Sequence, residues 1–182
     1  MKRAYNLVVD PGMKTLTVLF AILVFASMGS PQAGPAKLSA GATFDRLKSL
    51  AGEWEGTFTE GGQQLTATTS FRMVSNGSAL MNVLAAGTPH EMITMFHLDN
   101  RELLATHYCA AQNQPRFRLV PSAEANVVTF EFKDATNLSS PAAPHMVGLK
   151  MTFVDADHHE EEWTILGNGQ KSTRRFEFRR KP

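Results

Sequence analysis

The sequence predicts an all-β fold: an antiparallel up-and-down barrel of about ten strands, preceded by one short helix. From Glu53 onward apolar residues recur at every second position, the period of a strand with one buried face. Turn signals of Gly, Asn, Asp and Pro separate these segments at short intervals, which is typical of a barrel or a sandwich. Sequential hairpins without intervening helices favour the up-and-down barrel over a Greek-key sandwich.

The first 33 residues have the composition of a secretory signal peptide. Basic residues precede the apolar run 16–26, which is shorter than the roughly 20 residues of a membrane span, and small residues follow it. Met13 is an alternative start, and Gly29, Ser30 and Ala33 are alternative cleavage points. We therefore expect an exported protein, periplasmic or secreted, that meets the membrane only through this segment before cleavage. An uncleaved N-terminal anchor is the alternative.

The rest of the chain is expected to form one domain. Residues 34–43, rich in Pro, Gly, Ser and Ala, predict a flexible leader, and residues 44–180 predict a single barrel domain. Cys109 is the only cysteine, so no disulfide can form within the chain. The net charge of +1 argues against a general nucleic-acid surface, and no nucleic-acid partner is expected.

Local patterns predict the elements in chain order. Apolar residues at 44, 47 and 50 have helical spacing, so a helix over 44–50 is expected to plug one end of the barrel. Trp54, just after Gly52, opens the first strand. The strongest turn signals are Gly61-Gly62, Ser75-Asn76-Gly77 and Gly167-Asn168-Gly169. The predicted strands are 54–59, 64–74, 78–86, 91–98, 102–109, 116–120, 126–133, 146–154, 159–166 and 172–179, and the longest irregular stretch is 134–144.

The same alternation predicts which side chains point into the barrel. On four of the later strands, large apolar residues share one face, and that face should point inward. A fully packed interior and a partly empty, ligand-holding interior predict the same pattern. These inward sets are Val128, Phe130 and Phe132; Leu149, Met151 and Phe153; Trp163 and Ile165; and Phe176 and Phe178.

Gly52-Glu53-Trp54, behind a short helix and with arginines on the last strand, resembles the calycin superfamily of lipocalins, fatty-acid-binding proteins and nitrobindins. The resemblance implies that Trp54 packs across the closed end of the barrel and that Arg174, Arg175 or Arg179 lies over its ring. Such a cation–π contact contributes about 0.5–2 kcal/mol. Residues 44–56, 106–109 and 113–116 are further similar to an uncharacterised group of exported bacterial lipocalin-like proteins. The resemblance implies a structural role for Gly52, Trp54, Arg174 and Arg179.

His107 and Cys109 are the strongest candidate pair for chemistry. Two positions apart on one strand, they share the face of Leu103 and Ala105. A thiolate beside an imidazole would serve as a nucleophile or a metal site. We favour the alternative, a buried free cysteine near a hydrogen-bonded histidine, because two ligands are too few for a structural zinc site.

Two polar segments are weaker candidates. The acidic and histidine-rich run 155–162 would offer oxygen and imidazole ligands to a divalent cation. Its place at a predicted hairpin turn and on the outer face of the next strand favours a solvated turn instead. Arg116 and Arg118 would hold a ligand carboxylate at an open mouth, or would lie on an exposed strand edge.

The predicted function is binding of a small hydrophobic ligand inside the barrel, without catalysis and without a required cofactor. No nucleophile elbow, phosphate loop or zinc-protease motif is present in the sequence. A haem- or metal-dependent redox protein is the first alternative. The resemblance to nitrobindins implies a late histidine ligand for haem, but the strand 172–179 has no histidine, which leaves His97 or His107. A structural or envelope-interaction domain with a filled barrel is the second alternative. The candidate ligand-binding residues are Trp54, Phe96, His97, His107, Cys109, Arg116, Phe130, Met151 and Trp163.

Overall fold

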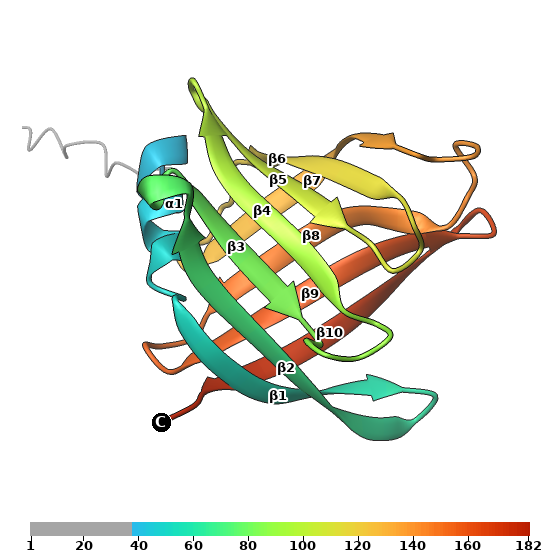
Figure 1. Cartoon of the computed structure of the whole chain (residues 1–182), viewed down its shortest axis with the longest axis horizontal. Coiled ribbons are helices and arrows are strands. Elements are labelled where there is room, and N and C mark those ends of the chain that lie inside the picture. The colour runs from blue at the N-terminus through green and yellow to red at the C-terminus, as the bar shows by residue number, and fades with distance from the viewer. Residues whose placement is uncertain (1–37) are drawn as a thin grey trace, which may run out of the picture. The chain divides into compact units, whose positions relative to one another are not determined.

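The computed structural model describes residues 38–182 (Figure 1). The predicted signal peptide, residues 1–33, and the first part of the predicted leader lie outside this range. No helix within residues 38–182 is long and apolar enough to cross a membrane.

Ten strands form a closed antiparallel barrel, and this confirms the predicted fold class. Each strand pairs with its neighbours in the chain, and the last strand pairs with the first. The strands are β1 (Gly52–Glu60), β2 (Gln63–Val74), β3 (Ala79–Leu84), β4 (Met92–Asp99), β5 (Glu102–Tyr108), β6 (Gln114–Val120), β7 (Val127–Thr136), β8 (His145–Phe153), β9 (His158–Gly167) and β10 (Gln170–Arg180). All ten predicted segments are strands, with ends that shift by a few residues.

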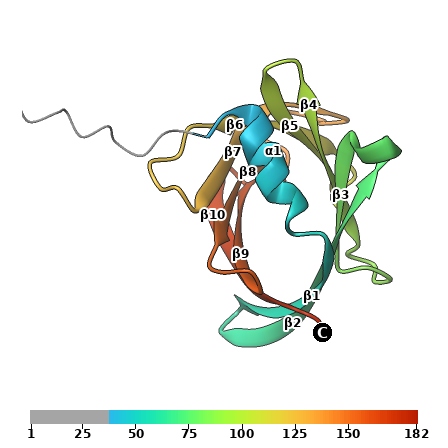
Figure 2. The same ribbon diagram turned by 90° about the vertical axis from the view of Figure 1, so that its left-hand side faces the viewer.

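The helix α1 (Ala40–Lys48) begins four residues before the predicted helix, so the end of the predicted flexible leader is helical. The reason is a cap: the Ser39 hydroxyl accepts a hydrogen bond from the Ala42 amide at 3.2 Å. Phe44 and Leu47 are buried against the barrel core. The helix contacts β2, β4 and β5 and lies across one end of the barrel, here called the closed end (Figure 2). The predicted plug is confirmed.

Trp54 closes this end from inside the barrel. Its side chain is 1% exposed, and its indole N–H donates to the Leu50 carbonyl at 2.8 Å. The chain passes from α1 into β1 through Gly52. Its φ of 131° is a backbone conformation that residues other than glycine rarely adopt. Trp54 and the helix are thereby tied together within a few residues.

The arginine over Trp54 is Arg180, and the expectation of Arg174, Arg175 or Arg179 is wrong. The Arg180 guanidinium lies 4.2 Å from the centroid of the Trp54 ring and donates to the carbonyls of Ala51 and Ser49 at 2.8 and 2.9 Å. Strand β10 extends one residue beyond its predicted end, so position 180 falls in phase with the inward-facing Phe176 and Phe178.

The three proposed arginines lie elsewhere on β10. Arg175 and Arg179 are out of phase with the inward face and are exposed. Arg174 is in phase but lies farther along the strand, where its guanidinium is 5.3 Å from the Phe58 ring and pairs with Glu60. The structural role predicted for Arg174 and Arg179 therefore belongs to Arg180.

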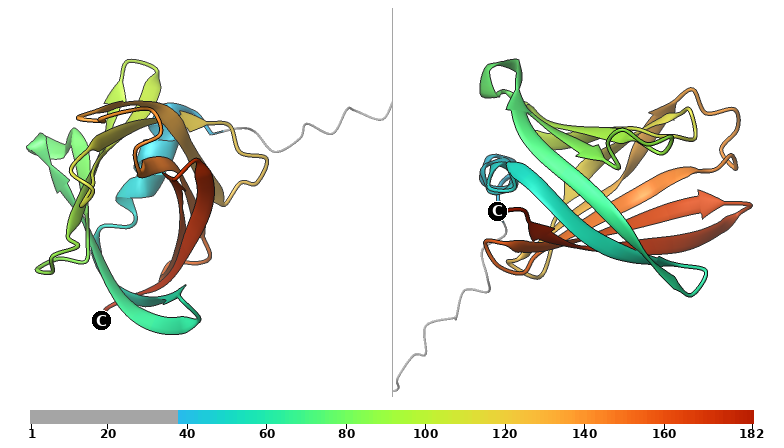
Figure 3. Two further views of the ribbon diagram at one scale, coloured as in Figure 1. Left: turned by 90° about the vertical axis from the view of Figure 1, so that its right-hand side faces the viewer. Right: turned by 60° about the horizontal axis from the view of Figure 1, so that its bottom comes forward.

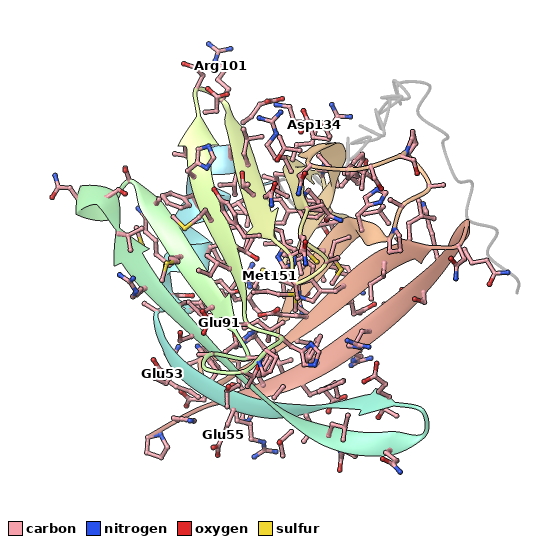
Figure 4. The ribbon with its side chains drawn as sticks, turned by 45° about the vertical axis from the view of Figure 1, so that its right-hand side comes forward. Glu53, Glu55, Glu91, Arg101, Asp134 and Met151 are labelled. Carbon is pink, nitrogen blue, oxygen red and sulfur yellow. The ribbon has the colours of Figure 1, made fainter. Side chains whose placement is uncertain are left out.

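Most of the inward residues predicted from alternation form the barrel core, whereas Phe132 and Ile165 are only half-buried. Val128, Phe130, Leu149, Met151, Phe153, Trp163, Phe176 and Phe178 are buried. Met151 lies in the middle of the barrel, whereas Glu53, Glu55 and Arg101 lie away from its interior (Figure 4). The end opposite α1, formed by the β1–β2, β3–β4, β5–β6, β7–β8 and β9–β10 connections, is here called the open end (Figure 3, left).

Replacing Arg180 with alanine should lower the free energy of unfolding by about 2–3 kcal/mol, because charge-assisted hydrogen bonds to two carbonyls and the contact with Trp54 are lost together. The matched control is Arg179→Ala, an exposed neighbour for which a change within about 0.5 kcal/mol is expected. Chemical denaturation of both variants measures the difference. Equal losses would show that Arg180 does not hold the closed end.

Candidate functional site

Several polar side chains lie inside the barrel, where water does not reach them. Asn82 donates to the Thr69 hydroxyl at 2.6 Å and to the Ser70 carbonyl at 3.2 Å. Buried polar groups are almost always paired in this way; among the described residues, His107 Nε2, His159 Nδ1 and Asn113 Oδ1 are buried without a partner. The buried polar residues on inward-facing strand positions are Thr69, Asn82, Thr94, His107, His159 and Glu161.

His107 is the buried polar residue with the clearest functional geometry. Its imidazole is 1% exposed, and Nδ1 lies 2.9 Å from the hydroxyl of Thr94, its partner on β4. Nε2 is also buried and has no hydrogen-bond partner among the described residues. Burial lowers the pKa of His107 to about 4, so the ring is neutral at pH 7. A neutral ring with Nδ1 anchored leaves Nε2 available to a ligand.

The imidazole borders a small space, here called the His107 cavity. About 10 Å³ of it is open to a water-sized sphere, which is the room that about one water molecule needs. Trp163 packs against His107, with ring centroids 4.7 Å apart. Met92 follows the β3–β4 connection and Met146 follows the β7–β8 connection, so the cavity lies toward the open end. Its lining residues are Leu84, Met92, His107, Met146, Trp163, Ile165, Arg174 and Phe176.

A buried carboxylate connects this cavity to the closed end. Glu161, 1% exposed, accepts a hydrogen bond from the Trp163 indole N–H at 2.9 Å, and its other oxygen lies 3.2 Å from Nε2 of His159. The His159 ring meets Trp54 edge-on at 4.4 Å and stacks on Phe178 at 5.1 Å. A continuous line of contacts therefore runs from Trp54 through His159, Glu161 and Trp163 to the cavity.

The prediction of an outer-face position is wrong for His159 and Glu161. Both point inward because they share the phase of Trp163 on β9. The alternation of β9 indicates an inward position for both residues. The outer-face prediction instead followed the general tendency of charged residues to face solvent. The preceding turn does match the solvated interpretation: His158 and Asp155 are 2.7 Å apart at the surface.

No group of three or more His, Cys, Asp or Glu side chains within residues 38–182 is arranged to hold a metal ion. In the 155–158 turn, the Asp157 amide and the His158 ring bond to the Asp155 carboxylate and hold its pKa below the usual range. The Asp155 carboxylate therefore makes its hydrogen bonds within the surface turn itself.

Cys109 lies just beyond the end of β5 and is partly buried. Burial raises the pKa of its thiol, so the thiol stays protonated at neutral pH, and its sulfur accepts a hydrogen bond from the Ala111 amide at 3.5 Å. The described residues contain no hydrogen bond between Cys109 and His107. This arrangement matches the interpretation of a free cysteine rather than an activated nucleophile.

His97 does not line the interior, contrary to expectation, and Arg116 lies on the exposed side of β6, as the second alternative for it predicted. Phe96 is buried on the inward face of β4, so its neighbour His97 must point outward. Arg116 is exposed and its guanidinium bonds to the Asp134 carboxylate at 2.7 Å, while the adjacent Phe117 is fully buried. Arg118, two positions further on β6, is exposed in the same way.

The other predicted ligand-binding residues divide between the core and the cavity. His107 and Trp163 line the His107 cavity. Phe96, Phe130 and Met151 are fully buried core residues that do not line it, and Trp54 lies at the closed end. Sequence reasoning missed Met92 and Met146, and their position beside His107 arises from the closure of the barrel rather than from any local pattern.

Comparison with known proteins supports the fold and does not name a function. No family model matches the sequence, and no curated protein matches it. A solved structure of a protein of unknown function from the DUF3598 family of Nostoc punctiforme has a TM-score of 0.51 at 13% identity, over 74% of this chain and 48% of that one. This chain thus spans about half the length of that protein. Rv2717c from M. tuberculosis has a TM-score of 0.49 at 16% identity, over 76% of this chain and 97% of that one.

The pKa of His107 predicts a specific dependence of stability on pH. The folded-state value of about 4 lies below the ordinary 6.5, so the unfolded chain takes up this proton first as the pH falls. The neutral His107 ring therefore contributes fully to the free energy of unfolding above pH 6.5, and this contribution is lost as the pH falls from 6.5 to 4. Wild-type protein should lose about 3 kcal/mol more than His107→Gln between pH 7 and pH 4. Denaturation curves at several pH values measure this, and parallel losses in both proteins would contradict it.

Proposed function

We propose that the barrel binds a small, largely apolar molecule through its open end, with one hydrogen-bonding group of the ligand at Nε2 of His107. The observation that carries this proposal is the unpaired, buried Nε2 atom beside a cavity. Leaving a buried polar atom unpaired costs about 1–3 kcal/mol, and a ligand that pairs with it recovers that cost. Ligand sites typically combine an apolar lining with a few such polar atoms.

The open end supplies the apolar lining. Phe58, Met92, Phe132 and Met146 are partly buried and pack against the core at this end. Phe58 packs against Phe176 on the adjacent strand, with ring centroids 4.9 Å apart. Methionine side chains are flexible and polarizable, so Met92 and Met146 are suited to adapt to a ligand.

The size of the cavity limits what the site accepts without rearrangement. About 10 Å³ is far below the roughly 300–1,000 Å³ of a usual ligand pocket, so binding requires Met92 and Met146 to turn away from His107. A haem macrocycle requires a far larger opening. His159, the other inward histidine on the strands around Trp163, is enclosed by Trp54, Phe71 and Phe178. The residues around either histidine therefore do not fit haem, and we favour the small apolar ligand.

We further propose that this protein binds its ligand without transforming it and acts after export. Support for binding alone comes from the protonated Cys109 thiol and the neutral His107 ring, which form no nucleophile–base pair. Support for export comes from the sequence of residues 1–33, which lie outside the described residues.

The apolar fluorescent dye N-phenyl-1-naphthylamine tests the proposed site. It should bind wild-type protein with a rise in fluorescence, and Met146→Trp should weaken binding at least tenfold because the larger side chain fills the His107 cavity. The matched control is Met95→Trp, because Met95 alternates with the inward Thr94 and Phe96 and so lies on the outer face of β4. Equal dye binding in both variants would refute the site. A Soret band on titration with haem that is lost in His107→Ala would instead favour the haem alternative.

A further inference from the structure

We propose that the His107 cavity is a binding site for a soft monovalent metal ion, Cu(I) or Ag(I), held by His107, Met92 and Met146 and capped by the face of Trp163. This inference goes beyond the binding of an apolar molecule and does not depend on it. It involves no redox step, because the ion enters and leaves in the same oxidation state.

The donor atoms around the cavity are the kind that such an ion prefers. Thioether sulfur and imidazole nitrogen are good ligands for Cu(I), whereas hard divalent cations take carboxylate and carbonyl oxygen. Met92 and Met146 line the same cavity as His107, from β4 and β8 respectively. Two methionines and one histidine therefore line a space that has no acidic side chain among its described lining residues.

His107 is already arranged as a metal-binding histidine. Metal-bound imidazoles usually have their other ring nitrogen hydrogen-bonded, which fixes the ring, and here Nδ1 lies 2.9 Å from the Thr94 hydroxyl. Nε2 is buried and unpaired among the described residues. A metal ion at Nε2 requires the tautomer in which Nδ1–H donates to the Thr94 hydroxyl.

The cavity has the size of an ion site. About 10 Å³ open to a water-sized sphere admits one water molecule or one metal ion, and it admits no larger ligand unless the methionines withdraw. An ion that draws the Met92 and Met146 sulfur atoms inward needs the closed arrangement of these side chains, whereas an apolar molecule needs the open one. The two kinds of occupant should therefore exclude each other.

Trp163 adds an electrostatic contribution to the site. The Trp163 ring borders the cavity beside His107, and an indole face attracts a cation. Its N–H donates to the buried side chain of Glu161 at 2.9 Å, which fixes the orientation of the ring. Arg174 also borders the cavity, but Glu60 pairs with its guanidinium and offsets its charge. Within residues 38–182, no acidic side chain lines the cavity to offset a second positive charge, and this favours a monovalent ion.

Titration with Ag(I) in chloride-free buffer tests the site, with every protein carrying Cys109→Ser because a free thiol binds silver by itself. Calorimetry should show one ion per chain. Binding should weaken at least 100-fold in Met92→Leu/Met146→Leu, which removes both sulfur atoms at nearly constant volume. Met95→Leu, the matched control on the outer face of β4, should bind as tightly as the parent. If the double variant does not fold, Met92→Leu and Met146→Leu are each compared with the parent instead, and each should weaken Ag(I) binding at least tenfold.

Tryptophan fluorescence provides the second readout. Emission should fall as Ag(I) binds, and Trp163→Phe should remove this fall, because Trp54 lies at the closed end. Silver binding that is indifferent to Met92 and Met146, or that leaves the emission of Trp163 unchanged, would overturn the proposal. Dye binding is measured separately on the same proteins. A negative result with Ag(I) therefore does not affect the test of the apolar ligand.

Discussion

The barrel depends on one cation held over one indole. Arg180 reaches from the end of β10 across Trp54 at the start of β1 and bonds to the carbonyls that follow α1. The backbone around it is joined at the same place, since the Arg180 amide donates to Asp157 and the Lys181 amide donates to Glu53. One residue thus links the first strand, the last strand, the helix and the β8–β9 turn.

The same interaction supports the candidate site at a distance. Trp54, held by Arg180, forms one wall around His159, and His159 and Trp163 share the two oxygens of Glu161. Trp163 in turn sets one side of the His107 cavity. A carboxylate buried in this way is expensive unless its hydrogen bonds are made, so the aromatic packing at the closed end and the orientation of Trp163 are energetically coupled.

The sequence was sufficient for the parts of the structure that local pattern determines. Alternation predicted the ten strands and the inward Phe130, Met151 and Trp163, and helical spacing predicted the plug. It misplaced His159 and Glu161, because polarity and phase gave opposite predictions on β9 and phase was the correct guide. The meeting of Met92, His107 and Met146 was not predictable, since three different strands bring them together only when the barrel closes.

The place of Arg180 in the chain also bears on how the molecule assembles. The strand that completes the ring is made after the nine others, so no shorter nascent chain contains both edges of the seam between β1 and β10. Until β10 arrives, β1 has an unpaired edge and Trp54 lacks its cation. The ring of strands can therefore close only after β10 has been synthesised.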